Sequence, residues 1–376
     1  MASLLIDIHT HLYPPSYLSL LKARKTVPYV HQPAGSSSPR LIILPSDDDP
    51  SIPQHQRGRP LDPSYSSLHL KLQFMKQHNI AASVVSLANP WLDFLPANEG
   101  AEAARMVNDE MVALGSSEKF KGKIFAFGTL PLSAPMDLIV QEIHRLQGLH
   151  KVIKGVILGT SGLGKGLDDE ALDPIWHALE ETGLLIFLHP HYGLPAEVFG
   201  PKLAASGHVL PLSMGFPMET TIAFTRMYLC GVFDRFPKLK MLLAHAGGTT
   251  PFLAGRVDSC VRHERAFLDK SGKLKQRRSI WEVLKENIWL DGVVYSEIGI
   301  RAAVDIVGSD RVLWGTDHPF FPPIESEETE QEWLSVKLNI EAVEKAQEPN
   351  STSAKNILGL NAVTLLDLEL PSEAYR

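Results

Sequence analysis

Apolar runs rich in valine, isoleucine, leucine and phenylalanine recur along the chain, and each is about as long as one β-strand. Near-continuous runs of this kind are typical of strands that are buried on both faces, as in a parallel sheet. The eight runs are SLLIDIH (3–9), AASVVSLAN (81–89), KIFAFGTLPL (123–132), VIKGVILGT (152–160), LLIFLHP (184–190), KMLLAHAGG (240–248), NIWLDGVVY (287–295) and RVLWGTDHP (311–319). We therefore expect eight parallel strands.

Segments with helical spacing separate these runs. Residues 168–183, for example, begin with acidic residues and end at Gly183, as helices commonly do. Strands that alternate with helices predict an α/β fold, a (β/α)8 TIM barrel, with a single domain over residues 1–376. Segment 14–63 breaks the rhythm and holds 10 of the 27 prolines, so we expect an inserted loop or lid after strand one. Residues 331–347 predict a C-terminal helical extension after strand eight.

Composition and charge narrow the functional classes. The formal net charge is −7, and Lys and Arg form no stripe, which argues against a nucleic-acid partner. The two cysteines, Cys230 and Cys260, follow no disulfide spacing. No apolar run approaches the ~20 residues of a membrane helix, and the N-terminus lacks the pattern of a secretory signal. We therefore expect a soluble cytoplasmic protein without a membrane or nucleic-acid partner.

Two histidines, His9 and His11, lie two residues apart at the end of the first apolar run. Residues i and i+2 of a strand share a face, so both side chains should project together. The carboxyl end of a barrel strand is where active sites lie, and two such imidazoles can bind one cation. The alternative is one hydrogen-bonded core histidine and one that faces a loop.

Three further strand ends carry the same kinds of side chain: His189, His245 and Asp317. Agreement at four separate strand ends favours a metal site over isolated core histidines. Nitrogen and carboxylate ligands suit Zn²⁺, with Mn²⁺ as a possibility. We expect His9, His11, His189 and Asp317 to bind one ion, and His245 to act as an acid or base beside it.

The motifs D-x-H-x-H on strand one, HP after strand five, HAGG on strand six and GTDxP on strand eight resemble the amidohydrolase superfamily. The match covers nearly the whole chain and is closest to the branch typified by 2-amino-3-carboxymuconate-6-semialdehyde decarboxylase. Within that branch, HPHYGLP and GTDHPFF make the chain look most like the fungal uracil-5-carboxylate (iso-orotate) decarboxylases of thymine salvage. The resemblance implies a zinc-dependent carboxy-lyase in which Asp317 delivers a proton and His245 holds or relays it.

One absence favours a mononuclear site. Binuclear amidohydrolases carry a carboxylated lysine at the end of strand four, whereas Lys154 lies near the beginning of that strand and Lys165 lies in the following loop. The same loop matches the first part of a P-loop, but Gly166 occupies the position that requires Ser or Thr. We therefore expect no nucleotide and no organic cofactor.

Four residues are candidates for binding a carboxylated substrate. The resemblance implies that Arg256 reaches substrate, often across a dimer interface, and that Arg59 is a second substrate arginine, although Arg57 lies close by and leaves the register open. Asn89, at the end of strand two, suits the edge of a pyrimidine, and Phe320 could pack on the ring. Each also has an ordinary structural interpretation: helix surface for Arg256, solvated loop for Arg59, turn for Asn89 and core for Phe320.

The sequence therefore predicts non-oxidative decarboxylation of a carboxylated ring, with uracil-5-carboxylate giving uracil and CO₂ as the first choice. Decarboxylation of a muconate semialdehyde or a hydroxybenzoate is the nearest alternative. The same ligands could instead activate water in a hydrolase or lactonase. A catalytically silent barrel that only binds ligands is the third alternative. The helix after strand six should carry Arg256 ~15 Å from that strand end, so we expect an obligate homodimer in which Arg256 binds the partner's substrate carboxylate.

Overall fold

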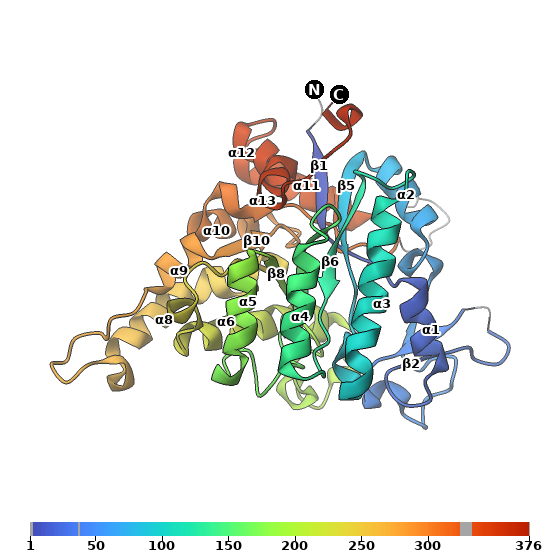
Figure 1. Cartoon of the computed structure of the whole chain (residues 1–376), viewed down its shortest axis with the longest axis horizontal. Coiled ribbons are helices and arrows are strands. Elements are labelled where there is room, and N and C mark those ends of the chain that lie inside the picture. Colours follow the sequence, from blue (N-terminus) through green and yellow to red (C-terminus); the bar gives the residue numbers. More distant parts are fainter. Residues whose placement is uncertain (1–2, 37, 324–332, 376) are drawn as a thin grey trace.

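The computed structural model describes residues 3–36, 38–323 and 333–375, and eight parallel strands form a barrel within them (Figure 1). They are β1 (Leu5–His11), β5 (Ile80–Ser86), β6 (Ile124–Thr129), β7 (Ile153–Gly159), β8 (Leu185–His189), β9 (Met241–Leu243), β10 (Ile288–Asp291) and β11 (Val312–Leu313), paired in this order. The first strand bonds back onto the segment after β11, since Ile8 N–H donates to Trp314 O at 3.2 Å. The predicted (β/α)8 barrel is confirmed.

Helices follow the strands and cover the outside of the barrel. They are α2 (Leu68–Gln77), α3 (Ala97–Ser116), α4 (Met136–Gln147), α5 (Asp173–Thr182), α6 (Phe216–Leu229), α7 (Val232–Arg235), α8 (Thr250–His263), α9 (Ile280–Glu286), α10 (Glu297–Val307) and α11 (Leu334–Gln347). Figure 1 shows α3, α4 and α5 side by side across the strands. The helix expected over 168–183 begins at Asp173, with Pro174 in its first turn, and ends at Thr182, and Gly183 after it adopts a left-handed conformation.

The strands are buried on both faces, as the apolar runs predicted. Every residue of β1 is buried. The ring of His9 meets that of Phe187 on β8 edge-on, with 5.0 Å between the centroids. Strand β8 lies four places from β1 in the sheet order, so this contact crosses the barrel. His9, and with it the residues that share its face, therefore points inward.

Segment 14–63 forms structure of its own beside the barrel. It contains α1 (Pro15–Ala23) and an antiparallel sheet of β2 (Tyr29–His31), β3 (Arg40–Ile42) and β4 (Arg59–Pro60). Ser16 N–H donates to Glu110 of α3 at 3.0 Å, which attaches α1 to the barrel helices. In Figure 1 this segment lies at the end opposite the chain termini. It therefore borders the carboxyl ends of the strands.

Strands β9 and β11 end well before their apolar runs do. Strand β9 ends at Leu243 and β11 at Leu313. His245 and Asp317 then adopt positive φ angles of 55° and 58°, which an extended strand does not allow. His245 and Asp317 therefore lie beyond the hydrogen-bonded part of their strands.

The C-terminal segment closes the barrel at its other end. The predicted extension over 331–347 is observed as α11 from Leu334, while residues 331 and 332 lie outside the described residues. Helices α12 (Thr352–Lys355) and α13 (Asn361–Leu366) follow, and Trp314 N–H donates to Ile357 O at 2.9 Å between them. Within the described ranges, no helix is long and apolar enough to cross a membrane.

Candidate metal centre

Four polar side chains meet inside the carboxyl end of the barrel. His9 and His11 come from β1, His189 ends β8 and Asp317 follows β11. One ligand atom from each lies within 4.8 Å of the other three, and all four residues are buried. The Nε2 atoms of His9 and His11 lie 3.4 and 3.3 Å from Asp317 Oδ1. Two tetrahedral ligands of zinc are separated by about the same distance, ~3.3 Å, when each lies ~2.0–2.1 Å from the ion.

The three histidines each have one ring nitrogen engaged and one free. The engaged atom is Nδ1, which contacts an oxygen in every case: Asp291 Oδ2 at 2.5 Å for His9, Ser86 Oγ at 3.0 Å for His11 and the Pro190 carbonyl at 2.8 Å for His189. In the part of the chain that the structure describes, the three buried Nε2 atoms have no hydrogen-bond partner. Buried polar atoms without partners are costly, and oxygen contacts to Nδ1 are usual for metal-binding histidines. The donor set therefore fits one divalent cation.

Asp291 is a residue of this centre that the sequence analysis missed. It ends β10, is fully buried, and its Oδ1 accepts backbone hydrogen bonds from Ala246 (2.9 Å) and Val293 (3.1 Å). Burial raises the pKa of this carboxyl, but the adjacent His9 ring outweighs it, and the net pKa is lowered. Burial likewise lowers the pKa of His9, but the carboxylates of Asp291 and Asp317 raise it to about 10. The sequence pattern could have identified Asp291, because it is one more polar residue at the end of an apolar strand.

His245 lies beside the cluster of four. Its ring centroid lies 5.1 Å from that of His9 and 5.3 Å from that of His189. Burial and the neighbouring His9 lower the pKa of His245, which favours the neutral ring. The left-handed backbone of His245 and of Asp317 costs about 1–2 kcal/mol at each residue. Strain of this kind clusters at functional sites, so the backbone itself marks both residues.

The insertion brings Arg59 to the mouth of the barrel. Arg59 lies on β4, and its guanidinium carbon lies 6.0 Å from the centroid of the Phe320 ring. The Phe320 ring meets the rings of His11 and Tyr65 edge-on, with centroid distances of 5.4 and 5.3 Å. A cation and an aromatic ring thus lie next to the metal-binding histidines. This pair suits a planar anion, because arginine can bind a carboxylate through two N–H groups.

Two other loops bring Asn89 and Phe216 close to the centre. Asn89 is buried after β5, and its Nδ2 donates to the backbone carbonyl of His191 at 2.6 Å. Phe216 begins α6, and its ring centroid lies 6.5 Å from that of His189 and 6.4 Å from that of His245. The sequence analysis missed Phe216, because a long irregular loop separates it from β8 and no spacing marks it.

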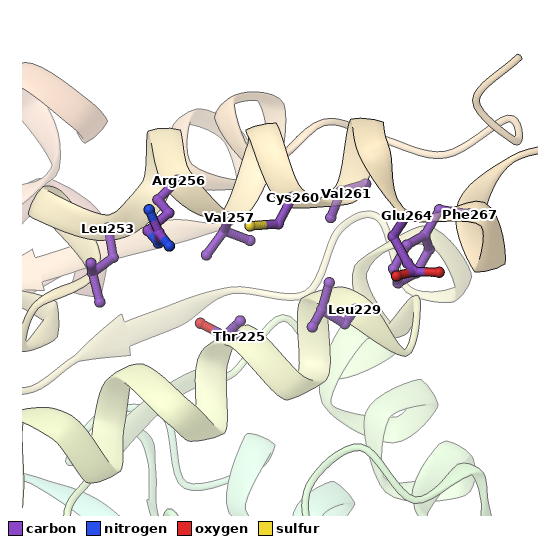
Figure 2. Close-up of a pocket in the computed structure, with 9 residues that line it drawn as sticks. All are labelled: Thr225, Leu229, Leu253, Arg256, Val257, Cys260, Val261, Glu264 and Phe267. Carbon is purple, nitrogen blue, oxygen red and sulfur yellow. The ribbon is translucent and has the colours of Figure 1, made fainter.

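Arg256 is the one predicted site residue that the structure leaves on the outer surface. It is exposed on α8 and lines a groove of about 440 Å³ between α6 and α8. Figure 2 shows Thr225 and Leu229 of α6 on one side of this groove and Leu253, Arg256 and Val257 of α8 on the other. The four clustered side chains lie inside the barrel instead. The structure therefore does not bring Arg256 together with them in one chain.

Strand β7 contributes no lysine to the cluster. Lys154 is the second residue of β7, and its Nζ donates to the carbonyl of Asp367 at 2.8 Å. Asp367 directly follows α13, in the C-terminal segment that packs at the amino ends of the strands. The carboxyl end of β7 is Gly159, which has no ligand atom in its side chain. Neither residue therefore offers a bridging lysine at this end of the barrel, and the mononuclear site stays a prediction.

Similar proteins share this arrangement of strands. A family model described as Amidohydrolase matches residues 6–368. The chain is 27% identical to 2-amino-3-carboxymuconate-6-semialdehyde decarboxylase of Dictyostelium discoideum, over 98% of its own length and 92% of the relative's. It is 50% identical to IDCase of Metarhizium anisopliae, whose apo crystal structure has a TM-score of 0.90 with 97% of each chain covered. The crystal structure of 5-carboxyvanillate decarboxylase from Novosphingobium aromaticivorans, with bound manganese, shares the fold at 20% identity, a TM-score of 0.73 and 98% coverage of each chain.

Proposed function

The chain belongs to the amidohydrolase family, and on that premise we propose that it is a metal-dependent decarboxylase that converts uracil-5-carboxylate (iso-orotate) to uracil and CO₂. Membership confirms the resemblance that the strand-end motifs indicated. The observation that carries the substrate is the 50% identity to IDCase, an isoorotate decarboxylase, over nearly the whole chain. The buried His₃Asp cluster supports the metal dependence.

Zinc is the proposed metal, with manganese as the alternative. His9, His11, His189 and Asp317 would hold the ion, and their nitrogen and carboxylate atoms suit either metal. When bound, the ion would offset the negative charge of the substrate carboxylate and polarise an adjacent carbonyl oxygen. The proposal includes no organic cofactor, because the non-oxidative loss of CO₂ from this ring needs no electron acceptor.

The substrate would bind between the centre and the insertion. Arg59 pairs with the carboxylate or a ring carbonyl, and Phe320 packs against the ring. Asn89 hydrogen-bonds the polar edge of the pyrimidine; its Nδ2 is already directed at the His191 carbonyl, which fixes the orientation of the amide. Together these residues place the ring carbon that bears the carboxylate next to Asp317.

The chemistry needs one proton at that ring carbon. Burial raises the pKa of Asp317, but His9 and His11 outweigh it and hold the pKa well below its ordinary value. Asp317 is therefore ionised at the start and must first take up a proton, which the neutral ring of His245 accepts from solvent and passes on. Asp317 then delivers the proton to the ring carbon. The bond to the carboxylate breaks, its electron pair restores the ring double bond, and CO₂ leaves.

A homodimer is part of the proposal, with Arg256 of one chain binding the substrate carboxylate of its partner. The exposed position of Arg256 on an apolar groove supports this arrangement. Phe252, one turn before Arg256 on α8, is 88% exposed, and large exposed apolar residues mark interaction surfaces. A cytoplasmic location is also proposed, because Cys230 and Cys260 are free thiols at exposed positions.

Product analysis tests the proposed reaction. Metal-loaded enzyme given 5-carboxyuracil should release uracil and CO₂ in equal amounts, measured by chromatography and CO₂ trapping. Parallel reactions contain a dihydroxybenzoate and 2-amino-3-carboxymuconate-6-semialdehyde. If the enzyme converts one of these two compounds and forms no uracil, it would be assigned to that decarboxylase activity instead. A product of bond hydrolysis that forms without release of CO₂ would indicate a hydrolase. Full metal content without turnover of any of these substrates would indicate a binding protein.

A further inference from the structure

Lys71, on α2, is a fully buried lysine behind the metal-binding cluster. Its Nζ hydrogen-bonds Thr10 Oγ1, lies 3.0 Å from His318 Nδ1 and lies 5.3 Å from the centroid of the Phe74 ring. Burying an ammonium group is costly unless acceptors surround it. The proposed reaction does not use this charge, so its position needs another explanation.

Both polar contacts of Lys71 are neighbours of metal-binding residues. Thr10 lies between the two histidines of β1 and points to the opposite face of the strand. His318 directly follows Asp317 in the chain. Thr10 Oγ1 also donates a hydrogen bond to the carbonyl of His318 at 2.9 Å. Lys71 thus joins β1 to the turn after β11, at the seam where the barrel closes.

Asp7 hydrogen-bonds Thr316, the residue that precedes Asp317 in the chain. Its Oδ1 accepts a hydrogen bond from Thr316 N–H at 3.0 Å, and its Oδ2 accepts one from Thr316 Oγ1 at 2.7 Å. Thr316 Oγ1 in turn accepts from His318 N–H at 3.1 Å. The peptides before and after Asp317 are therefore held by one network.

We propose that Lys71 is a positioning residue that holds Asp317 in its left-handed conformation and keeps its carboxylate among the metal ligands. The φ of 58° at Asp317 is unfavourable for a residue with a side chain, so the flanking contacts must maintain it. Without the ammonium group, Thr10 and the ring of His318 both lose the contact that ties β1 to the turn after β11. The backbone of Asp317 would then leave its left-handed conformation, and its carboxylate would no longer be held in place to bind the metal. This inference rests on the proposed metal site but not on the identity of the substrate.

The test compares Lys71→Met with Lys154→Met. Methionine keeps most of the length and volume of lysine without its charge. Lys154 is the control, because it is a partly buried lysine that donates one hydrogen bond at the other end of the barrel. The dissociation constant for Zn²⁺ is measured by chelator competition, and the visible spectrum is recorded for the Co²⁺-substituted protein. We expect Lys71→Met to weaken zinc binding by about 10–100-fold, as outer contacts of metal sites do, and to alter the cobalt spectrum. Lys154→Met should change neither.

Two further measurements keep the test decisive. Thr10→Val keeps the shape of the side chain and removes only the hydroxyl between Lys71 and His318, so it is measured in the same way should Lys71→Met not fold. At saturating metal, Lys71→Met should lower kcat for 5-carboxyuracil while KM changes by less than about 2-fold, because the binding residues are untouched. Wild-type metal affinity and cobalt spectrum in folded Lys71→Met or Thr10→Val, or an equal loss in Lys154→Met, would overturn the inference. A wild-type enzyme that ignores 5-carboxyuracil would instead refute the proposed function, since the metal measurements need no substrate.

Discussion

Replacing Asp291 by asparagine should weaken metal binding while leaving all four proposed ligands in place. Asp291 is fully buried, and its Oδ2 lies 2.5 Å from Nδ1 of His9, so the contact is a charge-assisted hydrogen bond. Such bonds contribute about 1.5–3 kcal/mol, against about 0.5–1.5 kcal/mol for neutral ones. Asparagine can still accept the bond, so the expected loss is the difference, about 1–2 kcal/mol. That corresponds to a metal dissociation constant raised by about 5–30-fold, since 1.4 kcal/mol is tenfold.

The assay is competition with a chromogenic chelator, with a thermal unfolding curve to establish that each variant is folded. Asp305→Asn is the matched control, because it makes the same substitution at an exposed position on α10. Its metal affinity should equal that of the wild type. The reasoning is refuted if Asp291→Asn binds metal within about 2-fold of this control, because His9 would then not depend on the outer carboxylate.

Three further predictions concern the centre and its partner chain. His245→Ala should keep its metal, measured by elemental analysis, and lose on the order of 10²–10⁴ in kcat, the usual contribution of a positioned acid or base; loss of the metal would make His245 a ligand. The double variant His9→Ala/His11→Ala should lose its metal, and retention of a full equivalent would contradict the ligand set. Chains carrying Arg256→Ala mixed with chains carrying His245→Ala should recover about a quarter of wild-type activity, since half of the statistical dimers contain one intact site; no recovery despite demonstrated subunit exchange would contradict a shared site.

The four clustered ligands could be predicted because simple geometry governs them. Alternation along a strand places His9 and His11 on one face, and parallel strands bring His189 and Asp317 to the same end of the barrel. No long-range detail of packing is needed for either step. The fold followed from the same pattern, because strands buried on both faces carry continuous apolar runs.

The outer contacts depend on packing that a sequence pattern does not contain. Lys71 looks like an ordinary surface residue of an amphipathic helix, and only the closed seam of the barrel shows that it is buried. The choice between Arg57 and Arg59 as the proposed substrate arginine also required the structure. Arg57 donates to the carbonyl of Ile52 at 2.7 Å within the insertion, whereas Arg59 reaches the ring of Phe320. Arg59 lies on β4 and Arg57 lies in the bend before it, and the proline-rich sequence did not predict this small sheet.

The most direct test of a mononuclear, metal-dependent decarboxylase is titration of the metal-free enzyme with Zn²⁺ or Mn²⁺ while uracil formation from 5-carboxyuracil is followed. The account predicts no turnover without metal, a linear rise in rate as metal is added, and saturation at one ion per chain for the metal that supports activity. Uracil formation that persists in the metal-free enzyme with excess chelator, or a rate that saturates only at two ions per chain, would contradict it.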